Sequence, residues 1–127
     1  MPVKYTMVKR SNLNDPEKPD KYYATPTKLK KMTLSEVGAE INKITRISNI
    51  DIVKILFAFS EVVPKLLSDG NIVSLGYLGD LRISFSSEGV ENPKKLKKNQ
   101  IKIVGIRYNP GKEMKENIKN IDFELAD

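Results

Sequence analysis

The stretch of residues 50–67 constrains the fold of this chain more than any other segment, because it predicts a helix whose apolar residues cover far more than one face. Ser48-Asn49-Ile50-Asp51 is a helix-start pattern and Asp69-Gly70 is a helix-stop pattern, which together predict one long helix ending at Ser68. A helix that faces a single core needs an apolar stripe of roughly 100°. The apolar positions here cover far more than that: Ile52, Val53, Ile55, Leu56, Phe57, Phe59, Val62, Val63, Leu66 and Leu67.

The outer side of this helix therefore needs a cover. In a chain of 127 residues the simplest cover is a second copy of the chain, which predicts a homodimer with this helix near its interface. The alternative is a central helix wrapped by its own chain. The dimer hypothesis assigns the interface to Ile52, Ile55, Leu56, Phe59 and Val63.

A shorter amphipathic helix is predicted just before the long one. From Leu34 to Ile44 the apolar residues recur at spacings of three and four, which is typical of one helix face. Thr33 is followed three residues later by Glu36, the signature of a capping box. Together these patterns predict a helix over residues 34–45.

The two ends of the chain favour strands. Residues 3–8 alternate between apolar and polar side chains, and residues 21–26 have a β-favouring composition. The loop between them is rich in Pro, Asn and Asp, so a hairpin over residues 3–26 is predicted. The tail of residues 121–125 also alternates and suits a strand that pairs with this hairpin.

The region after the long helix is predicted to form a small sheet and a final helix. Residues 72–75, 81–85 and 100–108 have strand patterns, and residues 112–121 carry a narrow apolar helical stripe. Parallel βαβ alternation is absent from this order of elements. The predicted fold class is therefore α+β.

The composition excludes several classes of function. The chain has no Cys and no His, so thiolate or imidazole metal sites, disulfides and Ser-His-Asp triads are impossible. It has no Gly-rich phosphate loop and no spaced acidic cluster. We therefore expect no enzyme activity, no cofactor or metal and no small-molecule substrate. Charges interrupt both the long apolar helix and the first ten residues, so neither a membrane span nor a signal segment is expected, and the expected location is the cytoplasm.

The positive charge of the chain is concentrated in one region. The net charge is +6, from 22 Lys and Arg against 16 Asp and Glu. Residues 92–119 alone hold nine basic and two acidic side chains, a local net charge of +7. Such a concentration favours a polyanionic partner.

Two short motifs, one before this basic region and one within it, carry a family resemblance. Gly76-Tyr77-Leu78-Gly79-Asp80-Leu81 follows the long helix, and Tyr108-Asn109-Pro110-Gly111-Lys112 opens the last helix. In their order and spacing, and in the patterning of the helix that begins Met32-Thr33-Leu34, residues 34–121 resemble the HU/IHF family of bacterial histone-like proteins. Residues 1–31 look like the N-terminal extension of longer HU-like proteins. This suggests a β-hairpin extension, residues 1–31, packed on an HU/IHF-like domain, residues 32–127.

The resemblance implies an intertwined homodimer with a helix-turn-helix pair, a three-stranded antiparallel sheet and a C-terminal helix. It implies a nucleoid protein of the cytoplasm that binds and bends double-stranded DNA without strong sequence preference. In the family, the segment between the second and third strands is a basic β-arm that embraces the minor groove, with a proline wedged between base steps. The candidate DNA-binding residues are Arg82, Asn92, Pro93, Lys94, Lys95, Lys97, Lys98, Lys102, Arg107, Lys112, Lys115 and Lys119.

The arm region departs from the family pattern and leaves alternatives open. This chain has Glu91-Asn92-Pro93 where the family has Arg-Asn-Pro, and residues 84–89 lack the usual basic run. Asn at the N-cap with Pro at the first helical position is helix-start chemistry, so Pro93 is either a wedge or the start of a short basic helix. The lysines of residues 94–98 and those of the predicted last helix either contact phosphates or form solvated surfaces. The competing function is a dimeric structural or protein-interaction module on an HU scaffold that has lost its arm.

Overall fold

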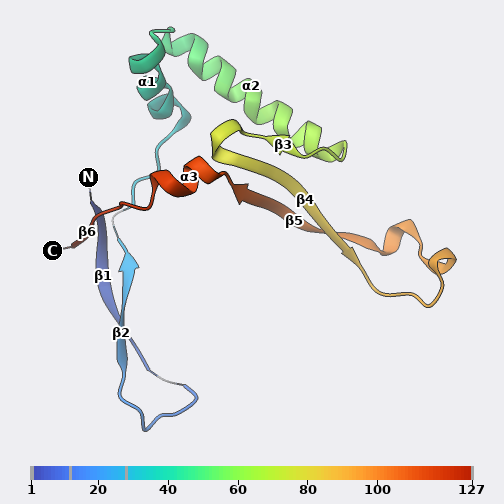
Figure 1. The fold of residues 1–127 in the computed structure, drawn as a ribbon, viewed down its shortest axis with the longest axis horizontal. Coiled ribbons are helices and arrows are strands. Elements are labelled where there is room, and N and C mark those ends of the chain that lie inside the picture. Colours follow the sequence, from blue (N-terminus) through green and yellow to red (C-terminus); the bar gives the residue numbers. More distant parts are fainter. Residues whose placement is uncertain (1, 12, 28, 127) are drawn as a thin grey trace. The chain divides into compact units, whose positions relative to one another are not determined.

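The computed structural model describes residues 2–11, 13–27 and 29–126, and it divides the chain into two compact units. The terminal unit combines Met1–Met32 with Ile118–Asp127, and the central unit is Thr33–Asn117. Residues 118–127 therefore belong with the N-terminal hairpin. Figure 1 shows the helices and strands that make up the two units.

The terminal unit is a three-stranded sheet with strand order β2-β1-β6. Strands β1 (Val3–Arg10) and β2 (Lys21–Pro26) pair antiparallel, which confirms the predicted hairpin. Strand β6 (Phe123–Leu125) runs parallel to β1, with Val3 opposite Phe123, which confirms the predicted pairing of the tail. Tyr5 and Met7 lie opposite Pro26 and Ala24. Because paired residues share a face, one face of this sheet carries mainly apolar side chains.

The first two helices of the central unit begin and end where the sequence predicts. Helix α1 (Leu34–Thr45) starts with the expected capping box, in which the Glu36 N–H donates to Thr33 Oγ1 at 3.2 Å. Helix α2 (Asn49–Ser68) is capped by Ser48. The helices approach closely at Gly38, where an added Cβ would lie 3.2 Å from Val53 Cγ2.

The sheet of the central unit packs on the second half of α2. Its strands β3 (Val73–Ser74), β4 (Gly79–Ser87) and β5 (Ile101–Pro110) are antiparallel, in the order β3-β4-β5. The hydrophobic core is small and consists of Val63, Leu67 and Val73, with Leu75, Leu81 and Ile83 packed against them. These observations confirm a mixed α+β fold with a three-stranded sheet.

The two sequence motifs meet at the base of this sheet. A 3₁₀ turn (Gly76–Leu78) leads into Gly79, whose φ of 119° is a conformation that L side chains rarely adopt. The Tyr108 hydroxyl donates to the Leu78 carbonyl at 2.6 Å, and the Gly111 N–H donates to the same oxygen at 3.1 Å. The glycines permit this close approach of two backbones.

Replacing Gly79 by alanine is therefore expected to lower the free energy of unfolding by about 2–4 kcal/mol. A Cβ at this position would collide with the Asn109 carbonyl oxygen and lie 2.7 Å from the Gly111 nitrogen, and both are backbone atoms that cannot rotate away. Urea denaturation measures the change. The matched control is Gly89→Ala, which meets open space and should change stability by less than about 0.5 kcal/mol. Equal effects of the two substitutions would contradict this account.

The last helix is shorter than predicted. The expected helix covered residues 112–121, but α3 is Lys112–Asn117, and residues 118–120 form a turn. Asparagine is a poor helix former, and the chain beyond the turn leaves to pair with β1, where the Val3 N–H donates to the Asp122 carbonyl at 2.8 Å. Tertiary strand pairing therefore overrides the local helical pattern.

Candidate nucleic-acid interface

The ribbon of β4 and β5 has one apolar and one polar face. Residues directly opposite each other in an antiparallel pair share a face. Leu81 lies opposite Tyr108 on the apolar face, and Arg82 lies opposite Arg107 on the other. The other pairs keep this division, although the register shifts at a bulge between Ser84 and Phe85. The apolar face also holds the pairs Ile83–Ile106 and Phe85–Ile103. The polar face also holds Asp80–Asn109, Ser84–Gly105 and Ser86–Lys102.

The polar face brings two arginines directly opposite each other. Like charges in this arrangement destabilise a strand pair unless an anion neutralises them. No ion pair is recorded for Arg82 or Arg107 among the described residues, and the buried Nε of Arg82 has no hydrogen-bond partner there. Both guanidinium groups are suited to phosphate oxygens, which they contact in a fixed fork geometry. Together with Lys102 they form a basic face on the ribbon.

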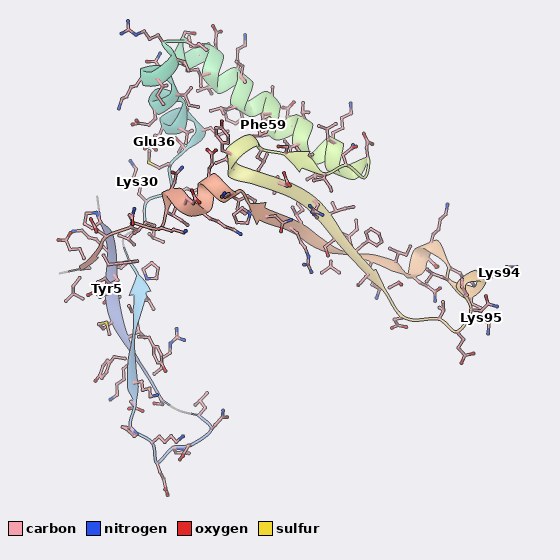
Figure 2. The ribbon with its side chains drawn as sticks, in the orientation of Figure 1. Tyr5, Lys30, Glu36, Phe59, Lys94 and Lys95 are labelled. Carbon is pink, nitrogen blue, oxygen red and sulfur yellow. The ribbon has the colours of Figure 1, made fainter. Side chains whose placement is uncertain are left out.

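The ribbon extends as a two-stranded arm away from α2 (Figure 1). Its last pair is Ser87 opposite Ile101, and residues 88–100, here called the arm tip, connect the strands. Figure 2 places Lys94 and Lys95 at the far end of this arm. The arm is thus present in this chain. The competing hypothesis of an HU scaffold that has lost its arm is therefore not favoured.

The arm tip contains the turn that its sequence predicts. The Lys94 N–H donates to Asn92 Oδ1 at 3.0 Å, and Pro93 opens a 3₁₀ turn (Pro93–Lys95). A second 3₁₀ turn is Lys98–Gln100. The tip is therefore a pair of exposed single turns on an extended arm, and Pro93 is both exposed and the first residue of a turn.

The lysines of the arm tip are available to a ligand. Lys94, Lys95, Lys97 and Lys98 are all exposed. The one ion pair recorded among them in the described chain joins Lys95 Nζ to Glu91 Oε2 at 4.0 Å, with 95% of the Glu91 side chain exposed. Such a surface pair contributes little stability. The four ammonium groups therefore form an open basic cluster.

The three lysines of the predicted last helix are not brought onto one helix face. Lys112 and Lys115 lie on α3, whereas Lys119 lies in the turn that follows and belongs to the terminal unit. The predicted helix of residues 112–121 would have carried all three lysines, but α3 ends at Asn117 and carries only two of them.

The predicted interface residues of α2 divide into two sets. Ile52 and Val63 are only 4% and 8% exposed, because they are buried within the central unit. Ile55 and Phe59 are 62% and 47% exposed, and Leu56 is half-buried. Figure 2 labels Phe59 on α2. Only the second set is available to a partner chain.

Sequence reasoning missed a second exposed apolar surface, on the apolar face of the arm. Phe85, Ile103 and Ile106 are 62%, 74% and 67% exposed. The alternating residues of β5 carried this signal, but the register that aligns them with Phe85 was needed to reveal one continuous surface. A patch of this kind on a folded chain marks an interaction site.

The described ranges offer neither a metal-binding cluster nor a membrane-spanning helix. Those ranges contain no group of three or more His, Cys, Asp or Glu side chains placed to hold a metal ion. No helix in the same part of the chain is long and apolar enough to cross a membrane.

Comparisons with known proteins agree with this architecture. No curated protein gives a match. A crystal structure from Bacteroides vulgatus ATCC 8482, described as a candidate bacterial DNA-binding protein, is similar, with a TM-score of 0.63 and 15% identity. The similarity covers 98% of this chain and 48% of that one, so this chain spans about half the length of that protein. At this identity the likeness shows a shared fold.

The family model that matches is HU-HIG, described as an HU domain fused to a wHTH, Ig or glycine-rich motif. The match covers residues 1–125 and thus includes the terminal hairpin as well as the helices and the arm. With nearly every residue matched, this chain belongs to the HU-HIG family of HU-domain proteins.

Proposed function

We propose that this protein binds double-stranded DNA without strong sequence preference and bends it, as a non-catalytic, nucleoid-associated homodimer. The observation that carries the proposal is the pair of opposed arginines, Arg82 and Arg107, on the polar face of a ribbon that ends in four exposed lysines. All of these groups suit phosphate oxygens, and none of them needs a particular base sequence. Membership of an HU family and the description of the similar structure support the same partner.

The exposed apolar surfaces support a homodimer. Ile55 and Phe59 on α2, and Phe85 and Ile103 on the arm, need a partner surface, and a second copy supplies complementary groups of the same kind. Two copies double the net charge to about +12 and present two arms. DNA that contacts both arms and the basic faces between them would be bent by wrapping, with Pro93 a candidate wedge in the minor groove.

The binding experiment is a titration of the full chain with a duplex of about 30 base pairs across a salt series. Each neutralised phosphate contributes about −0.9 to the slope of log affinity against log salt, so several contacts per dimer predict a slope of about −6 or steeper. Duplex DNA labelled at both ends should also show increased end-to-end energy transfer when bound. A slope near zero, or no binding at about 50 mM salt, would sink the proposal. Tighter binding of an RNA duplex of matched sequence would redirect it to RNA.

A further inference from the structure

The terminal unit has a basic hollow at the loop end of the β1–β2 hairpin. The hollow has a volume of about 570 Å³, and the side chains lining it include Arg10, Lys18, Lys21 and Tyr23. Its lining residues contain three cations and no acidic group. A hollow of this size with convergent charges is suited to an anionic group of a larger ligand.

The charges at this hollow repeat the arrangement of the arm. Arg10 lies directly opposite Lys21 in the antiparallel pair, so their side chains share a face and repel each other. Among the residues that the structure describes, Arg10, Lys18 and Lys21 form no ion pair. Lys9, on the opposite face by strand alternation, has Asp20 as a partner at 3.3 Å. Of the acidic residues in the loop, Asp20 thus pairs on the other side of the hairpin, and Asp15 and Glu17 do not line the hollow.

An aromatic ring holds one of these cations in place. The Arg10 guanidinium lies over the Tyr23 ring, with Cζ 5.7 Å from the ring centroid. This contact restrains the guanidinium while its N–H groups stay available for a bidentate contact. Lys18 and Lys21 add point charges around it.

We infer that this hollow binds the phosphodiester backbone of duplex DNA, as a second contact surface separate from the arm. The inference rests on the proposed function. Three unpaired cations in an open hollow favour a ligand with repeated negative charges, and the opposed Arg10–Lys21 pair matches the opposed arginines of β4 and β5. The N-terminal extension would then lengthen the DNA footprint of each subunit.

The test compares the full chain with the triple variant Arg10→Gln, Lys18→Gln, Lys21→Gln, by titrating both with the duplex across the salt series. The triple variant is expected to reduce the salt slope by about 2–3 per chain and to weaken binding by at least about tenfold near 100 mM salt. A matched pair of single variants removes one lysine from each face of the hairpin. Lys21→Gln should lower the slope by about 1, whereas Lys9→Gln should leave it unchanged.

Two outcomes of the titration separate the two hypotheses. If the unaltered chain binds and the triple variant keeps the same slope, the second surface is overturned and the proposed function stands. If the unaltered chain binds no DNA, both fail. Backbone amide shifts of the unaltered chain give a check that needs no variant: shifts at Ser11 and Lys21 on adding duplex support the inference. Their absence at saturation, or the same shifts with an acidic peptide but not with DNA, overturns it.

Discussion

Replacing Lys94, Lys95, Lys97 and Lys98 together by alanine is expected to weaken duplex binding by on the order of 100-fold or more at about 100 mM salt. The four lysines are exposed at the arm tip, and a homodimer presents the set twice. Because lysine contacts phosphates as a point charge, affinity should fall by a similar factor for all DNA sequences. The salt slope should become shallower by about 0.9 for each lost contact.

The same measurement distinguishes a local contact from a change in overall charge. Lys94→Ala with Lys95→Ala removes two charges from the arm tip, and Lys43→Ala with Lys65→Ala removes two from the exposed surfaces of α1 and α2. Only the first pair should change the slope by about 2 per chain. Equal effects would indicate that net charge alone drives binding, and an unchanged slope in the quadruple variant would exclude the arm tip as the contact surface.

Replacing Ile55 by aspartate is expected to convert the proposed dimer into monomers at micromolar concentration, with dimer affinity reduced on the order of 1000-fold. The side chain of Ile55 is 62% exposed on α2, so the substitution is tolerated in a separate chain, but in the dimer it would bury an unpaired carboxylate. Sedimentation equilibrium measures the change. The melting temperature of the unaltered protein should rise with its concentration, and that of the variant should not.

The control for this substitution lies in the terminal unit. Leu13 is 92% exposed in the hairpin loop, so Leu13→Asp makes a similar chemical change on an element other than α2 and should leave the proposed dimer intact. Ile52→Ala gives a second comparison, because Ile52 is buried within the central unit and its truncation should lower the free energy of unfolding by about 2–5 kcal/mol. A monomeric unaltered protein at tens of micromolar, or a dimeric Ile55→Asp variant, would contradict the interface.

Local patterns predicted the elements whose structure depends on nearby residues. The capping box of Thr33 and Glu36 fixes the start of α1, and Asn92 caps the turn at the arm tip, because each hydrogen bond spans only two or three residues. The last helix was predicted too long because its end depends on β1, which lies more than a hundred residues away in the sequence. The same limit applied to the arm: Asn92-Pro93 predicts a turn, but only the pairing of Ser87 with Ile101 makes the flanking segments an arm.

The candidate site was predicted in composition but not in arrangement. Every lysine of the arm tip was identified from the local charge, since charge is read directly from the sequence. The opposition of Arg82 and Arg107 depends on strand register, which a single sequence does not specify. The division of the α2 residues into buried Ile52 and exposed Ile55 likewise depends on which side of the helix the sheet covers.

The bulge between Ser84 and Phe85 decides on which side of the arm Lys102 lies. Lys102 is five positions from Arg107, so strict alternation would place the two on opposite sides. The bulge shifts the phase by one residue and places Lys102 opposite Ser86, on the side of the arginines. A one-residue slip of β5 would exchange Lys102 for Ile101 and Ile103 on that side without altering the composition or net charge. Lys102 therefore joins the basic face of Arg82 and Arg107 only because the bulge is present.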